Sequence, residues 1–125
     1  MKKKIKRVYV VGPLTPKGIK SANPAIEYLI NISDMVDISL EVFFAKYSPF
    51  CSALDFLFFI KSKKRITEAM IKKYSKDWLE VCDAILLTPG WRKSSGSIAE
   101  VKLAKALDIP VFNTLEELLK YDKKE

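Results

Sequence analysis

Val8-Tyr9-Val10-Val11, followed directly by Gly12-Pro13, is the clearest indication of the fold in this 125-residue chain. A continuous apolar run that stops at a turn signal is typical of a strand buried on both faces. A second run of this kind, Ala84-Ile85-Leu86-Leu87, opens at Asp83 and ends at Pro89-Gly90. Such doubly buried strands are typical of parallel sheets covered by helices.

The rest of the chain alternates helix and strand patterns. Apolar spacing predicts helices over residues 24–33, 66–82 and 98–107, the first opened by Asn23-Pro24 as N-cap and first helical residue. Thr114 and Glu117 fit a capping box for a short last helix. Alternating apolar residues predict a strand over 38–44, and residues 109–112 predict another. Residues 47–60, which include Pro49, fit either a short buried helix or a subunit contact.

Strands that alternate with helices predict an α/β fold. We expect a flavodoxin-like (Rossmann-like) parallel sheet of four to five strands, with right-handed crossovers and helices on both faces. The length fits a single domain, residues 1–125, with a basic N-terminal arm at residues 1–7. Ligands of such sheets bind beyond the carboxyl ends of the strands. The candidate site therefore lies in loops 12–18 and 88–97.

Composition excludes several kinds of chemistry. The chain has no histidine, so Ser-His-Asp triads, Cys-His dyads and HExxH zinc sites are impossible. Cys51 and Cys82 lack metal-site neighbours and are expected to be reduced thiols in the core. No metal or redox cofactor is implied. Without a membrane-length apolar run or a signal-peptide pattern, we expect a cytoplasmic protein with no membrane partner.

The net charge of +7 comes largely from the N-terminal arm, because Lys2, Lys3, Lys4, Lys6 and Arg7 include no acidic neighbour. Without these five, 17 basic residues stand against 15 acidic ones. Such an arm either contacts nucleic acid or, more commonly, is a solubilising overhang. Nucleic-acid binding is the least favoured function, because the aromatic residues at 56–59 lie among apolar residues rather than cations.

Loop 88–97 has the composition of an anion site. Small residues precede the predicted helix: Ser94, Ser95, Gly96 and Ser97. Free backbone N–H groups and the positive helix end would face a ligand there. Arg92 and Lys93 add charge, and Trp91 could stack on a ring. Glu100 follows in the helix, where the helix dipole would keep a nucleophilic carboxylate ionised. Its spacing from Ser97 equally fits a capping box, which spacing alone favours.

Three stretches together resemble the nucleoside 2-deoxyribosyltransferase superfamily, which includes the 2′-deoxynucleoside 5′-monophosphate N-glycosidases. They are residues 8–13, residues 82–87, and Pro89-Gly90-Trp91 with Ser94-x-Gly96-x-x-x-Glu100 and Ala104. In that family a glutamate attacks C1′ of the deoxyribose, and water or a second base resolves the glycosyl-enzyme intermediate with retention.

The resemblance implies a role for each matching residue. Glu100 matches the nucleophile, Tyr9 matches a tyrosine that approaches it, and Ser94 matches the serine that binds the 5′-phosphate in the monophosphate hydrolases. The substrate-binding residues would be Gly12, Pro13, Trp91, Ser94, Ser95, Gly96 and Ser97. Tyr9 also fits an aromatic side chain packed at a strand end.

The chain departs from the family pattern at Ser75. The family places an aspartate eight residues before the one that opens the third strand, Asp83 here, and that aspartate helps to protonate the leaving base. Asp77 points about 200° away around the helix and cannot substitute. Loss of this acid leaves open slow hydrolysis, a better leaving group, another acid such as Asp55, or no chemistry. Asp83 itself is expected to cap or end its helix.

Two functions therefore stay open. One is an enzyme that cleaves or transfers at the N-glycosidic bond of a 2′-deoxyribonucleoside 5′-monophosphate or nucleoside. The other is a binding module that holds a nucleotide in the same pocket without turnover. Family members complete their sites across subunit contacts, so we expect a homodimer or higher homo-oligomer with residues 47–60 at the contact.

Overall fold

The computed structural model describes residues 4–13 and 24–123 of the chain. The strands β1 (Arg7–Val11), β2 (Ser48–Cys51), β3 (Ala84–Leu87) and β4 (Val111–Phe112) form one parallel sheet in the order β2-β1-β3-β4. The α-helices are α1 (Pro24–Phe44), α2 (Asp55–Lys61), α3 (Glu68–Leu79), α4 (Ser95–Ala106) and α5 (Leu115–Lys123). Two short 3₁₀ turns lie at Ser52–Leu54 and Trp91–Lys93. The predicted flavodoxin-like α/β fold is confirmed.

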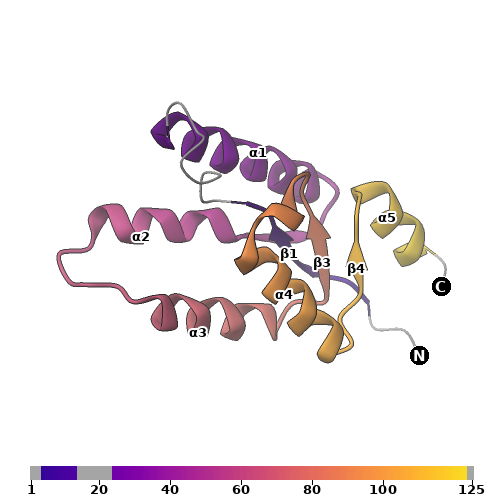
Figure 1. The fold of residues 1–125 in the computed structure, drawn as a ribbon. Coiled ribbons are helices and arrows are strands. Elements are labelled where there is room, and N and C mark those ends of the chain that lie inside the picture. Colours follow the sequence, from indigo (N-terminus) through magenta and orange to yellow (C-terminus); the bar gives the residue numbers. More distant parts are fainter. Residues whose placement is uncertain (1–3, 14–23, 124–125) are drawn as a thin grey trace.

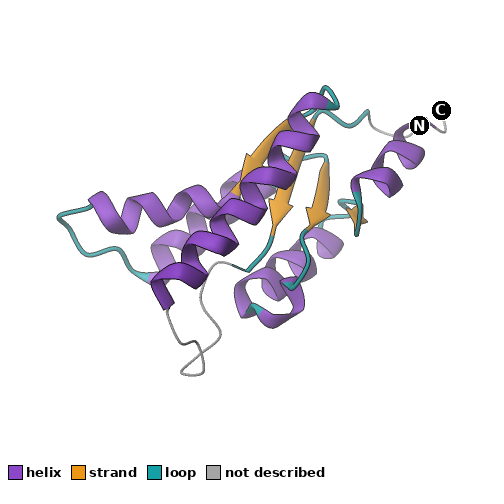
Figure 2. Cartoon of the chain, turned by 90° about the horizontal axis from the view of Figure 1, so that it is seen from above, coloured by secondary structure: helices purple, strands orange, loops and turns teal. Residues whose placement is uncertain are grey.

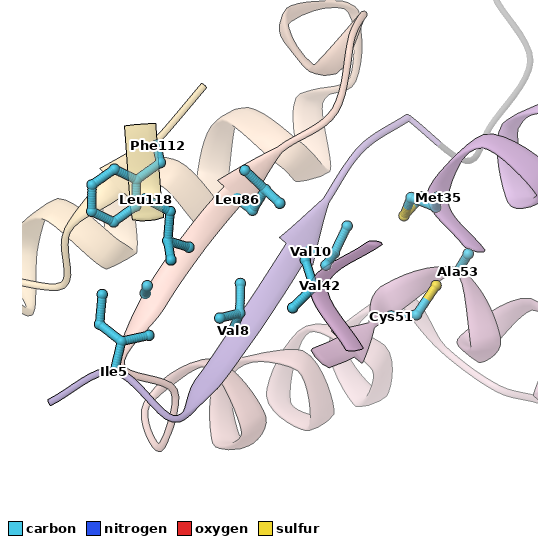
Figure 3. Packing of buried hydrophobic residues seen from close by; sticks show 11 residues of the cluster. Ile5, Val8, Val10, Met35, Val42, Cys51, Ala53, Leu86, Phe112 and Leu118 are labelled. Carbon is cyan, nitrogen blue, oxygen red and sulfur yellow. The ribbon is translucent and has the colours of Figure 1, made fainter. Parts of the chain in front are cut away.

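Helices cover both faces of the sheet, which gives three layers (Figures 1 and 2). Alternate residues of β1 point to opposite faces. Val8 and Val10 join a cluster with residues of α1 and α5 (Figure 3), whereas Tyr9 packs with residues of α3 and α4 on the other face. All four residues from Val8 to Val11 are fully buried, as the apolar run predicts.

The prediction of a strand over residues 38–44 is wrong, because these residues form the second half of α1. Met35, Ser39 and Val42 are buried and follow one another at intervals of four and three, which is one face of a helix. Phe43 and Phe44 are exposed, so apolar residues occur all around this helix and imitate a strand pattern. The helix begins at Pro24 as predicted, and Asn23 lies outside the described residues.

The second strand is β2, which lies within residues 47–60, the stretch that the sequence assigns to either a helix or a subunit contact. Pro49 lies opposite Val8 of β1, and β2 is an edge strand, where a residue without an N–H group is tolerated. After β2 the chain turns into α2. The helix expected there is present but not buried, since Leu57, Phe58 and Ile60 are about half exposed.

Asp83 was predicted to cap or end a helix, but its side chain instead binds the backbone at the start of β1. Its Oδ2 accepts hydrogen bonds from the backbone N–H groups of Lys6, at 2.8 Å, and Arg7, at 2.9 Å. Ile5 is buried in the core, so the predicted basic arm joins the fold from that residue onward; residues 1–3 lie outside the described part. None of the described helices is long and apolar enough to cross a membrane.

Candidate active site

A cavity of about 750 Å³ lies where β1 and β2 end, enclosed by residues of α2, α3 and α4. Gly12 and Ser52, the residues directly after β1 and β2, form part of its lining. Gly12 has no room for a side chain, because a Cβ there would lie 1.9 Å from Oγ1 of Thr88. The backbone after β1 therefore passes close to Thr88 at the end of β3. This is the edge of the sheet at which the sequence predicts a ligand.

Glu100 lines this cavity and contacts the buried Tyr9, although 91 positions separate the two residues in the sequence. The Tyr9 hydroxyl donates a hydrogen bond to Oε2 of Glu100, which lines the cavity. The Tyr9 ring stacks on Phe50 with ring centroids 5.2 Å apart, and Phe50 stacks on Trp78. Burial raises the pKa of Tyr9 far above its usual value, so the hydroxyl stays protonated and acts as a donor. Tyr9 is thus both a packed aromatic side chain and a partner of Glu100.

Glu100 does not cap its helix, which corrects the capping-box interpretation. The N-cap of α4 is Ser94, whose Oγ accepts the N–H of Ser97 at 3.2 Å. Glu100 lies in the second turn, beyond the first turn where the helix dipole acts. Burial raises the pKa of Glu100 to about 7, the Tyr9 hydrogen bond opposes this rise, and the charge of Asp55 adds to it. The expectation that the dipole keeps Glu100 ionised is therefore wrong.

Ser75 and Asp55 form a second polar pair in the same cavity. Asp55 is the first residue of α2 and is only 5% exposed. Ser75 of α3 donates from Oγ to Oδ2 of Asp55 at 3.5 Å. Burial raises the pKa of Asp55 to about 6. Asp77 is exposed and pairs with Lys73 at 2.9 Å on the helix surface, which agrees with its exclusion from the site.

The N-terminus of α4 forms the other end of the lining, through Ser94, Ser95, Gly96 and Ser97. Ser97 is 1% exposed, and within residues 4–13 and 24–123 its Oγ has no hydrogen-bond partner. The lining also includes three cationic residues, Lys72, Lys76 and Lys93, of which Lys72 pairs with Glu68 of the same lining and Lys76 pairs with Glu80. Backbone N–H groups at a helix start, a buried hydroxyl without a partner and nearby ammonium groups together suit an anionic ligand.

Two predicted binding residues lie apart from this cavity. Trp91 lines a separate hollow of about 360 Å³ after β3, and the Arg92 guanidinium lies 5.2 Å from the centroid of its ring. Pro13 lies close to Gly90, whose φ of 86° is a left-handed conformation that favours glycine. Among the described residues, no group of three cysteine, aspartate or glutamate side chains could hold a metal ion.

Asp55 is the site residue that sequence reasoning named only as one of several alternatives. No motif or spacing connects residue 55 with residue 75 or residue 100. The sequence offered one signal, an acidic residue between Leu54 and an apolar run. A charge buried among apolar residues is unfavourable unless other groups pair with it.

Fold and cavity together define the class: a flavodoxin-like α/β protein whose acidic residues line a cavity at the carboxyl edge of its sheet. The family described as Domain of unknown function (DUF4406) matches residues 51–113, half of the chain, and the chain belongs to that family. The matched segment contains Asp55, Ser75 and Glu100, and it begins after Tyr9. A search of curated proteins finds no match to this chain.

Proposed function

We propose that the protein cleaves or transfers at the N-glycosidic bond of a 2′-deoxyribonucleoside 5′-monophosphate, with Glu100 as the nucleophile. The observation that carries this proposal is the contact of the Tyr9 hydroxyl with Glu100, which lines a cavity together with the N-terminus of α4. The resemblance to the nucleoside 2-deoxyribosyltransferase superfamily supports the same roles, because Tyr9, Ser94 and Glu100 occupy matching positions.

The reaction proceeds in two steps. An oxygen of Glu100 attacks C1′, the bond from C1′ to the base nitrogen breaks, and its electron pair leaves with the base, which takes up a proton. Water or a second base then attacks C1′ and releases the Glu100 carboxylate. Tyr9 orients the carboxylate, and its hydrogen bond favours the ionised form that attacks. Two inversions at C1′ give retention.

The lining of the cavity combines polar groups with apolar side chains, and this combination favours a nucleotide over a nucleoside. The backbone at Ser95 and Gly96 and the hydroxyl of Ser97 suit a 5′-phosphate. The lining also includes the apolar side chains of Phe59, Ile71 and Leu79, which suit the face of a base. The second candidate is a module that binds the nucleotide without turnover, and the serine at position 75 is the observation that favours it.

We also propose that the protein is a cytoplasmic homodimer or higher homo-oligomer. Side chains along α2 support this assembly, because Leu57, Phe58 and Ile60 are 53%, 46% and 60% exposed. Sedimentation at micromolar concentration is expected to show a dimer or larger species, and Leu57→Lys/Ile60→Lys is expected to shift it to monomer. A monomeric wild-type protein would contradict this assembly. The buried free thiols of Cys51 and Cys82 fit a reducing compartment.

The test of the function is release of base from the four 2′-deoxyribonucleoside 5′-monophosphates and the matching nucleosides. Wild type is expected to release base, with preference for the monophosphates. Glu100→Gln is expected to lose at least about 10³-fold in rate, as loss of a nucleophile does. Glu116→Gln is the matched control, because Glu116 is exposed on α5 and pairs with Lys120.

Unchanged release by Glu100→Gln would contradict the proposal. If wild type releases no base from any of these compounds but a monophosphate raises its melting temperature, the binding module becomes the better account.

A further inference from the structure

Asp55 is a buried carboxylate that no structural role explains. It is the first residue of α2, and the N-cap position, Leu54, makes no side-chain hydrogen bond, so Asp55 does not cap the helix. Its Oδ1 is buried and has no hydrogen-bond partner in the part of the chain that the structure describes. A buried carboxylate with an unsatisfied oxygen destabilises a fold and is more common at functional sites.

Asp55 and Glu100 line the same cavity, and each accepts a hydrogen bond from a neighbouring hydroxyl group. Ser75 donates to Oδ2 of Asp55, and Tyr9 donates to Oε2 of Glu100. The charge of Asp55 is close enough to raise the pKa of Glu100. The two carboxylates therefore belong to one constellation in one cavity, as the cleavage of a glycosidic bond through a covalent intermediate requires.

We propose that Asp55 is the general acid that protonates the leaving base, and that Ser75 positions it. The inference rests on the function proposed above. As the C1′–N bond breaks, the proton moves from the Asp55 carboxyl group to a ring nitrogen of the base. Asp55 becomes a carboxylate, and the Ser75 hydroxyl stabilises that charge through Oδ2. The raised pKa of Asp55 agrees with this role, because near neutral pH a larger fraction of it carries a proton than of an ordinary aspartate.

This assignment also accounts for the serine at position 75. An aspartate there would lie beside Asp55, and two adjacent carboxylates cannot both ionise easily. The acid thus comes from α2 in this chain, and α3 supplies the hydroxyl that holds it. A chain that exchanges the two residues should keep the same pair of groups in the cavity.

The test compares two leaving groups in Asp55→Asn. A 2′-deoxyribonucleoside 5′-monophosphate needs a proton on its base, whereas the 4-nitrophenyl 2-deoxyriboside 5-phosphate releases a stable phenolate without one. Asp55→Asn is expected to lose about 10²–10⁴-fold in base release while release of 4-nitrophenolate is nearly unchanged. The exchanged variant Asp55→Ser/Ser75→Asp is expected to recover part of the base release. Asp77→Asn, a carboxylate outside the cavity on α3, is the control and should match wild type.

The outcomes separate the two proposals. Glu100→Gln is expected to lose both activities, because the nucleophile serves either leaving group. If Asp55→Asn loses both activities equally, or loses neither, Asp55 is not the acid and the inference is overturned while the function stands. If wild type releases neither base nor 4-nitrophenolate, the proposed function itself is wrong.

Discussion

Two polar pairs form the site, Tyr9 with Glu100 and Asp55 with Ser75, and different parts of the fold hold them in place. Tyr9 and Glu100 come from β1 and α4, where Val101 and Ala104 pack against the buried cluster on that face of the sheet. Asp55 and Ser75 come from α2 and α3, which project away from the sheet and are joined at their far end by a loop (Figure 1). The position of Glu100 therefore depends on the core, whereas the position of Asp55 depends on two helices with little buried surface. Substitutions near the two pairs should therefore differ in their effects on stability and activity.

The largest expected difference between these regions is in stability. Leu86→Ala removes a side chain of the central strand β3 that is 1% exposed and packs in the core, and it is expected to lower the free energy of unfolding by about 2–5 kcal/mol. Ile60→Ala on α2, where the side chain is 60% exposed, is expected to stay within about 0.5 kcal/mol. Urea unfolding below the concentration of self-association measures both. Equal losses would mean that α2 packs as firmly as the sheet.

Tyr9→Phe tests the pair of Tyr9 and Glu100 without changing Asp55 or Ser75. The substitution keeps the ring on Phe50 and removes the hydroxyl that donates to Glu100. Base release is expected to fall by about 10–100-fold, the equivalent of one hydrogen bond to a charged group. Since that hydroxyl lowers the pKa of Glu100, its loss should move the ascending limb of the pH–rate profile to higher pH. Tyr47→Phe, which loses only a bond to Asp122, is the control. An unmoved limb would contradict the assignment.

The strands β1 and β3 and the helix α3, which carries Ser75, were predictable from the sequence, whereas β2 and the second half of α1 were not. β1 and β3 are continuous apolar runs that end in glycine or proline, a signal that depends only on local sequence. β2 contains Pro49 and is stable because it pairs with β1 at the edge, which no local pattern encodes. The 38–44 stretch imitates a strand because Leu40, Phe43 and Phe44 are apolar although they lie on the exposed side of α1, opposite the buried Val42.

The same contrast holds within the site. Tyr9, Ser94 and Glu100 were named because their stretches resemble a known family, whereas spacing alone favoured a capping role for Glu100. The contact between Asp55 and Ser75 spans 20 positions and depends on how α2 and α3 are oriented. Trp91 was predicted to bind at the same site, but it lines a different hollow from Glu100, which no local pattern indicates.

The smallest expected effect is the pH dependence of stability. The folded protein keeps a proton on Glu100 up to about pH 7, whereas an unfolded chain releases it near the ordinary value of 4.5. Stability therefore falls as pH rises through this window, and the full cost is present above it. Glu100→Gln removes the ionisation and is expected to gain about 1–3 kcal/mol at pH 8 relative to pH 4. Thermal unfolding at both values measures this, with Glu116→Gln as the control. An equal gain at both values would contradict the raised pKa.

Mass spectrometry of a rapidly quenched reaction shows whether Glu100 forms a covalent bond with C1′ of the sugar. Wild type mixed with its preferred monophosphate is expected to carry a 2-deoxyribosyl 5-phosphate group on the tryptic peptide of residues 94–102, with the ester on Glu100. The same peptide from Glu100→Gln should carry none. Rapid base release with an unmodified peptide, or an adduct on another residue, would contradict Glu100 as the nucleophile.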